Sequence, residues 1–140
     1  MHGTPAAQAA LSAEQRQQLV DRARTMLERA YAPYSKFHVG AALLTEAGQI
    51  FTGCNVENAS YGLTNCAERT AIFTAIAAEG PGMRIRAMVI LNSANIACSP
   101  CGACRQVIFE FGPQALVIYQ GNGGLAESSA EKLLPAGFHF

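Results

Sequence analysis

The chain has no tryptophan and carries little charge: of its 140 residues, 14% are Asp, Glu, Lys or Arg, and ten basic residues balance ten acidic ones. This balance leaves no excess positive charge with which to hold a polyanion, so a nucleic-acid polymer is not an expected substrate. Long apolar runs are also lacking, although half of the residues are apolar. The run at residues 87–91, for example, is too short to span a bilayer, so no membrane partner is expected.

Residues 1–15 lack the basic segment and long apolar core of a secretory signal, so we expect a cytoplasmic location. The five cysteines are an odd number, and their CxxC spacing in a chain without such a signal favours metal or redox use over a disulfide framework. A length of 140 residues suits one domain that buries its own core, and no linker or repeat indicates a second. We therefore expect a single domain over residues 1–140, with residues 1–11 flexible.

Hydrophobic spacing and turn residues predict alternating helices and strands, and hence an α/β fold class. Ser12 and Gln15 have the spacing of a capping box in front of a helical pattern. The first two strands are expected to form a hairpin, and two later alternations of strand and helix predict parallel pairing with right-handed crossovers. The predicted helices are 13–30, 66–78, 101–111 and a short turn at 130–134; the predicted strands are 39–45, 49–54, 85–91 and 115–119, with a weak fifth strand after the turn at 121–124.

The most informative feature is the segment Cys66-Ala67-Glu68, followed far downstream by Pro100-Cys101-Gly102-Ala103-Cys104. Three thiolates leave one corner of a tetrahedral zinc free for water, which is typical of a catalytic ion, whereas four ligands indicate a structural one. Both ligand groups begin predicted helices, where unpaired N–H groups and the helix dipole stabilise negative charge and lower the pKa of a thiol. The spacing therefore predicts a zinc site suited to hydrolysis.

Glu68 lies two residues after Cys66, near enough to reach a water at the zinc without being forced to ligate the ion. When water attacks an amidine-like ring carbon, one carboxylate that gains and loses a proton can protonate both the ring nitrogen and the leaving amine. Three thiolates on a dication leave a negative cluster. Arg69 is the candidate to compensate it by donating a hydrogen bond to a ligating sulfur.

These motifs, with SKFHVGAAL before them and NVENASY between them, resemble the small homotetrameric cytidine deaminases over residues 32–138. The resemblance implies a three-layer α/β/α sandwich around a mixed sheet of about five strands. It also implies one zinc per subunit on Cys66, Cys101 and Cys104, with Glu68 moving protons while water attacks C4 of the pyrimidine. Cytidine and deoxycytidine would become uridine and deoxyuridine with release of ammonia, as in pyrimidine salvage.

The same resemblance implies where the substrate binds. Ribose hydroxyls would bind to Asn55 and Glu57, the base would stack on Phe37, and the loop NVENASY would form the sugar-side wall. The ending LLPAGF resembles the tail of the family, which implies that Phe138 enters the site of a neighbouring subunit in a homotetramer. The substrate-binding residues implied in this way are Phe37, Asn55, Glu57, Ala59, Tyr61, Ala67 and, from the neighbouring subunit, Phe138.

Three alternatives stay open. Cys98 precedes Cys101 by three residues, and a fourth thiolate would close the zinc site and give a structural module that binds a partner, although Pro100 is expected to direct Cys98 away. A zinc deaminase could also act on another aminopyrimidine nucleoside or a nucleoside antibiotic. A CxxC thiol oxidoreductase fits less well, because a third, distant cysteine favours a metal.

Two positions near these motifs have no assigned role. Cys54, at the end of a predicted strand, is expected to be a core residue. His38 stands where many members of the family have proline, and the histidines, which have no ligand spacing to the cysteines, are expected to face solvent.

Overall fold

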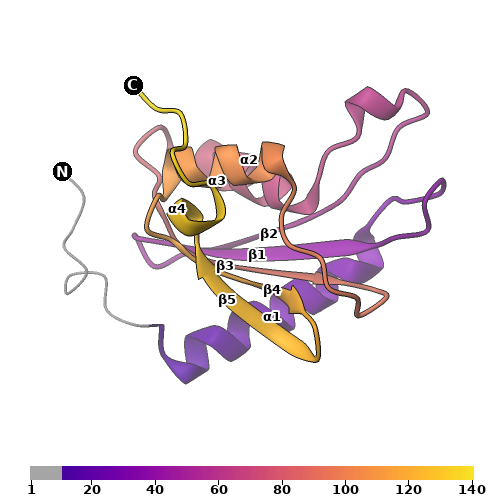
Figure 1. Cartoon of the computed structure of the whole chain (residues 1–140), viewed down its shortest axis with the longest axis horizontal. Coiled ribbons are helices and arrows are strands. Elements are labelled where there is room, and N and C mark those ends of the chain that lie inside the picture. The colour runs from indigo at the N-terminus through magenta and orange to yellow at the C-terminus, as the bar shows by residue number, and fades with distance from the viewer. Residues whose placement is uncertain (1–10) are drawn as a thin grey trace.

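The computed structural model describes residues 11–140, whose strands form one five-stranded mixed sheet in the order β2-β1-β3-β4-β5, with helices on both faces (Figure 1). The expected flexibility of residues 1–11 lies outside the described residues except at Leu11, which packs against the core. The elements in chain order are α1 (Ala13–Met26), η1 (Leu27–Arg29), β1 (Val39–Thr45), β2 (Ile50–Cys54), η2 (Tyr61–Leu63), α2 (Ala67–Glu79), β3 (Ile85–Asn92), α3 (Gly102–Phe111), β4 (Leu116–Gly121), β5 (Gly124–Ser129) and α4 (Ala130–Leu133).

The strand pairing confirms part of the predicted topology and corrects another part. The hairpin of β1 and β2 is antiparallel, and β3 pairs in parallel with β4 across α3, as expected. The other predicted parallel pair, across α2, does not form, because β1 lies between β2 and β3 and pairs antiparallel with both. Burial explains this order: β1 is buried from Gly40 to Thr45 and takes an inner position, whereas Gly53 is the one buried residue of β2, which lies at the edge.

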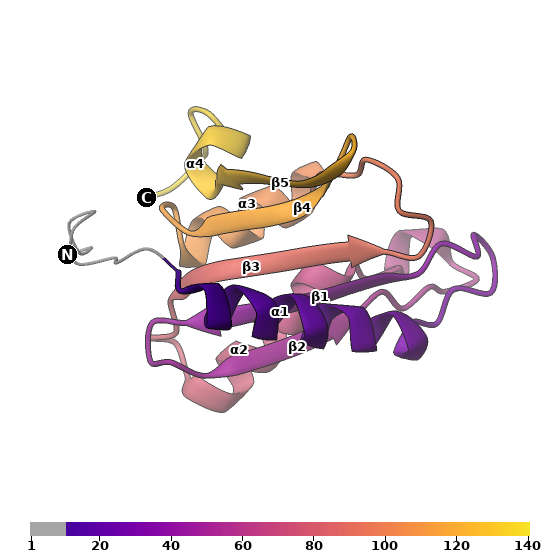
Figure 2. The same cartoon turned by 90° about the horizontal axis from the view of Figure 1, so that it is seen from below.

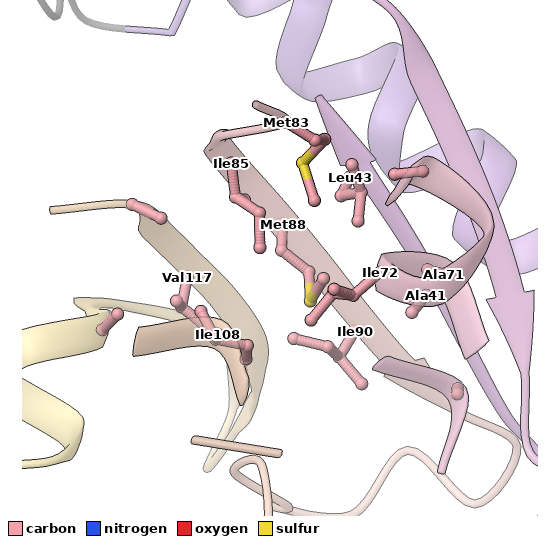
Figure 3. Packing of buried hydrophobic residues seen from close by; sticks show 14 residues of the cluster. Ala41, Leu43, Ala71, Ile72, Met83, Ile85, Met88, Ile90, Ile108 and Val117 are labelled. Atoms are coloured by element: carbon pink, nitrogen blue, oxygen red, sulfur yellow. The ribbon is translucent and has the colours of Figure 1, made fainter. Parts of the chain in front are cut away.

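Two apolar clusters, one on each face of the sheet, make the fold a three-layer α/β/α sandwich, as the resemblance implies. On one face, α1 contributes Leu19, Val20 and Ala23 to the first cluster. Helices α2 and α3 cover the other face, and Figure 2 shows α1 on the side of the sheet opposite to them. Figure 3 shows the second cluster, in which Ile72 of α2 is directed toward Met88 of β3.

The local signals at the helix ends explain where the helices begin. Ser12 is the N-cap of α1, and its hydroxyl and the Gln15 side chain make the reciprocal hydrogen bonds of the predicted capping box. The first helix is shorter than predicted, because its last turn tightens into the 3₁₀ helix η1 and Ala30 is no longer helical. Within residues 11–140, no helix has the length and apolar content needed to cross a membrane.

The architecture places two helix N-termini beside each other at one end of the sheet. Helices α2 and α3 pack against each other on the same face, and α3 follows the loop that leaves the end of β3. Cys66 immediately precedes α2, and Cys101 immediately precedes α3. The fold therefore brings together two cysteine segments that are 35 residues apart in the sequence.

Candidate active site

Both cysteine segments cap helices, which confirms the sequence prediction. Cys66 is the N-cap of α2, and Cys101 is the N-cap of α3. The backbone N–H of Cys104, in the first turn of α3, donates a hydrogen bond to the Cys101 sulfur at 3.5 Å. The first N–H groups of a helix have no partners within it, and the Cys101 sulfur accepts one of them.

The three sulfurs have the spacing that a tetrahedral zinc requires. The Sγ atoms of Cys66 and Cys101 are 3.8 Å apart, and those of Cys66, Cys101 and Cys104 all lie within 4.8 Å of one another. Two sulfurs that each lie about 2.3 Å from a tetrahedral zinc are about 3.8 Å apart, so this donor set fits the ion. The three cysteines are therefore positioned to bind a metal ion, and zinc fits the spacing of their sulfurs.

Arg69 compensates the negative charge of the cluster. Its Nη2 donates a hydrogen bond to the Cys66 sulfur at 3.2 Å, while its Nε is buried without a hydrogen-bond partner. A hydrogen bond from the Cys104 thiol is the main cause that lowers the pKa of Cys66 to about 5, and Arg69 lowers it further. The same shared proton, together with burial, raises the pKa of Cys104. Cys66 is thus the thiol of this pair that deprotonates more readily, and the thiolate is the form that ligates a cation.

Glu68 is a buried carboxyl group beside this cluster. It is 5% exposed, in the first turn of α2. Burial is the main cause that raises its pKa to about 7, and negative charge on Cys66 raises it further. A carboxyl group with a pKa near neutrality can both accept and donate a proton, which is the property that a proton shuttle requires.

Cys98 does not belong to the sulfur cluster found among the described residues. Its backbone N–H donates to the Gln120 carbonyl at 2.8 Å, and its exposed thiol has a pKa raised by partial burial and by neighbouring negative groups. Within residues 11–140, a four-thiolate structural site therefore has no fourth ligand in place. Cys54 is partly buried at the end of β2, where desolvation raises the pKa of its thiol, in keeping with a core residue.

Asn55 holds the segment that leads into β1. Its side chain is buried, its Oδ1 accepts from the Val39 N–H at 2.8 Å, and its Nδ2 donates to the Phe37 carbonyl at 2.8 Å. His38 lies between Phe37 and Val39 in the sequence, and its Nδ1 donates to the Leu27 carbonyl at 3.1 Å. His38 is therefore partly buried and bonded, and the expectation that it faces solvent is wrong.

Glu57 is bound to the turn that precedes Phe37. Its carboxylate accepts from the backbone N–H groups of Tyr34 and Ser35 and from the Ser35 hydroxyl. The hydroxyl is the largest of the causes that hold the pKa of Glu57 below its ordinary value. Ser35 Oγ also accepts from the Phe37 N–H at 3.0 Å. Sequence reasoning assigned no role to Ser35, although it lies within the segment SKFHVGAAL.

The single chain brings only some of the predicted substrate residues together. Glu57 and Tyr61 help to line a cavity of about 390 Å³, whose lining among the described residues includes none of the three zinc ligands. Ala67 is fully buried at the first position of α2, and Ala59 is exposed in the loop after Glu57. Phe138, 66% exposed, contacts Phe140 with ring centroids 5.2 Å apart.

Comparison with known proteins identifies a family. Residues 13–120 match the cytidine and deoxycytidylate deaminase zinc-binding region. A cytidine deaminase of Sporosarcina psychrophila is 46% identical over 125 residues, which cover 87% of this chain and 90% of that protein. One of Halalkalibacterium halodurans is 47% identical over 126 residues, covering 88% and 93%. The crystal structure of a cytidine deaminase from Burkholderia pseudomallei superposes with a TM-score of 0.80 at 50% identity, covering 87% and 98%.

Proposed function

Because the chain belongs to the zinc-binding cytidine and deoxycytidylate deaminase family, we propose that it hydrolyses cytidine and deoxycytidine to uridine and deoxyuridine with release of ammonia. It is a hydrolase, and zinc is its cofactor. The observation that carries the proposal is the cluster of three sulfurs within 4.8 Å of one another, next to the buried carboxyl group of Glu68. Pyrimidine salvage is the role that this reaction serves.

The reaction needs an activated water and a group that moves protons. Cys66, Cys101 and Cys104 would hold the zinc, which would supply Lewis-acid activation of a water molecule. Glu68 accepts a proton from that water as its oxygen bonds to C4 of the pyrimidine, and gives the proton to N3 of the ring. The carboxyl group then transfers the second proton of the water to the exocyclic amine, the C4–N bond breaks, and ammonia leaves.

Charge balance at the sulfurs supports the same chemistry. Three thiolates would weaken the Lewis acidity of a zinc ion, and the chain places compensating positive charge against them. Arg69 donates to Cys66 at 3.2 Å, and the N-terminus of α3 donates to Cys101 through the Cys104 N–H. Both contacts withdraw electron density from the sulfurs, which would leave a zinc ion held there acidic enough to activate water.

The sugar side of the site is proposed from Asn55 and Glu57. The side-chain amide of Asn55 accepts one backbone hydrogen bond through Oδ1 and donates one through Nδ2. The second N–H of Nδ2 therefore remains to donate to a ribose hydroxyl. The Glu57 carboxylate, kept charged by its hydrogen bonds, accepts from a hydroxyl of the sugar. Phe37 stacks on the base, the N–H of Ala67 at the start of α2 contacts its edge, and Ala59 and Tyr61 complete the wall around the sugar.

We propose that the active unit is a homotetramer and that it works in the cytoplasm. Phe138 and Tyr61 are large apolar side chains that are 66% and 74% exposed in the single chain, and burial of both in a neighbouring subunit would remove apolar surface from water. A reducing compartment suits a site of free thiolates, because oxidation would remove the zinc ligands.

One experiment tests the proposed activity against its alternatives. The purified protein is incubated separately with cytidine, deoxycytidine and cytosine, while released ammonia and bound zinc are measured together. We expect ammonia from both nucleosides, little from the free base, and one zinc per chain. Full zinc content with no ammonia from either nucleoside would overturn the proposal.

A further inference from the structure

Arg105, the residue after the zinc ligand Cys104, contacts two separate segments of the chain. Its Nε donates to the Pro100 carbonyl at 2.6 Å, and its Nη2 donates to the Ser99 hydroxyl at 2.7 Å. Its Nη1 donates to the Leu133 carbonyl at 2.8 Å. Three nitrogens of one guanidinium therefore bind the loop that ends at Cys101 and the last residue of α4.

These contacts fix the loop and the helix relative to each other. The guanidinium is planar and rigid, so three bonds from one group set the relative position of the acceptors. Pro100 is buried and immediately precedes Cys101, so holding its carbonyl holds the backbone that carries this ligand. The Leu133 carbonyl belongs to the end of a helix, where carbonyl groups have no partner within the helix.

The residue after Arg105 extends the same connection toward the C-terminus. Nε2 of Gln106 donates to the Phe138 carbonyl at 3.0 Å. Gly137 lies so close to α3 that a Cβ built there would be 3.1 Å from the Phe109 ring. The segment 133–138, here called the C-terminal tail, is thus attached along α3 beginning one residue after Cys104.

We propose that Arg105 is a positioning residue that couples the zinc-binding loop to the C-terminal tail. The zinc ligand Cys101 and the tail that carries Phe138 are held by one side chain, so retention of the ion and order in the tail depend on each other. The functional consequence of this inference rests on the proposed function. If Phe138 completes the active site of a neighbouring subunit, Arg105 supports both the zinc site of its own subunit and the tail that enters the neighbouring site. Coupling of this kind is reciprocal.

The first test measures zinc release from the zinc-loaded protein with a chromogenic chelator in excess. We expect Arg105→Gln to release zinc on the order of tenfold faster or more, which is the lower end of the effect of losing a group that orients a metal ligand. Arg105→Lys keeps the positive charge but has one compact ammonium in place of the planar guanidinium. It should therefore retain zinc better than Arg105→Gln but less well than the original protein. Arg22→Lys, on the exposed side of α1, is the matched control and should release zinc at the original rate. Release from Arg105→Gln at the original rate would overturn the inference.

The second test needs no variant and asks whether zinc orders the tail. Hydrogen exchange is followed at the amides of Leu134 and Gly137, which are bonded to the Ala130 and Leu134 carbonyls. Removing zinc should speed exchange at both amides by several-fold while the amide of Leu43 in β1 stays protected. In Arg105→Gln, exchange in the tail should be fast with or without zinc. Equal exchange in the original protein with and without zinc would contradict the coupling.

Neither measurement involves a nucleoside, so the outcomes separate this inference from the proposed function. A protein that couples zinc to the tail but deaminates no nucleoside would retain the inference and lose the function. A protein that deaminates cytidine, but whose tail exchanges hydrogen equally fast with and without zinc, would retain the function and lose the inference. Gln106→Ala adds a third comparison: it removes the hydrogen bond to the Phe138 carbonyl at the far end of the tail but leaves the Arg105 contacts in place, so it should raise the KM for cytidine and speed zinc release less than Arg105→Gln does.

Discussion

Gly53 of β2 lies against Ala71 of α2 so closely that a Cβ built on Gly53 would be 2.4 Å from the Ala71 backbone nitrogen. The same Cβ would be 2.5 Å from the carbonyl oxygen of Ala67, the first residue of α2. Contacts this short to backbone atoms cannot be relieved by turning a side chain. Because glycine has no side chain, residue 53 allows the sheet to lie this close to the helix that carries Glu68.

Replacing Gly53 with alanine should push α2 away from β2 and lower the free energy of unfolding. Overpacking of a core commonly costs roughly 1–3 kcal/mol, and contact with backbone favours the upper part of that range. Urea denaturation of the zinc-loaded protein measures the change. Gly62→Ala is the control, because nothing lies within 4 Å of a Cβ at that position. Equal stability of the two variants would show that α2 can shift freely.

The sequence was sufficient to predict features that depend on residues close together in the chain. The capping box at Ser12 and the helix starts after Cys66 and Cys101 follow from local hydrogen-bonding needs, and the structure has all three. The order of the strands depends on which apolar faces meet in space. An apolar run such as 39–45 does not say which neighbours it will pair with, so the position of β1 between β2 and β3 was not predicted.

The same distinction holds in the site. The three zinc ligands could be predicted because their type and spacing are tied to the geometry of the ion. Ser35 and Arg105 were missed because their roles depend on acceptors that are distant in sequence, Glu57 for the first and Leu133 for the second. A serine beside a proposed stacking residue, or an arginine beside a ligand, has no distinguishing local pattern. His38 was misplaced for a similar reason, since its partner Leu27 lies in another element.

Replacing Glu68 with glutamine should abolish proton transfer while preserving the fold and the zinc. The amide has nearly the same shape but cannot gain and lose a proton, so turnover of cytidine should fall by on the order of 10² or more. Loss of the cytidine absorbance band measures turnover, and zinc content and thermal unfolding serve as controls. Turnover comparable to that of the original protein would reject the shuttle role.

The two cysteines at residues 98 and 101 should differ completely in their importance to the metal. Cys101→Ala removes one of the three clustered sulfurs and should lose both zinc and activity, whereas Cys98→Ala removes an exposed thiol outside the cluster and should keep both. Metal analysis of the two purified variants decides between these outcomes. Zinc loss from the Cys98 variant would favour a four-thiolate structural site.

Ser35→Ala should weaken substrate binding more than chemistry. The hydroxyl contacts both the Glu57 carboxylate and the Phe37 N–H, so its loss releases two residues proposed to touch the nucleoside. We expect the KM for cytidine to rise on the order of tenfold, in line with the loss of a hydrogen bond to a charged group, with kcat nearly unchanged. Ser35→Thr, which retains the hydroxyl, should recover most of the affinity, and Ser128→Ala in β5 is a neutral control. A fall in kcat at constant KM would place Ser35 elsewhere in the mechanism.

Removing residues 138–140 should depress activity more than folding. Phe138 and Phe140 are exposed, and the apolar clusters of the sheet do not include them, so the truncated chain keeps its core. If Phe138 completes the site of a neighbouring subunit, the truncated protein should bind cytidine more weakly and form fewer tetramers, while its thermal unfolding changes little. Light scattering gives the oligomeric state, and steady-state kinetics give the KM. Phe140→Ala alone is the matched control, because it removes the ring that packs on Phe138 but leaves Phe138 itself in place. A truncated protein that turns over cytidine normally as a monomer would show that each chain carries a complete site.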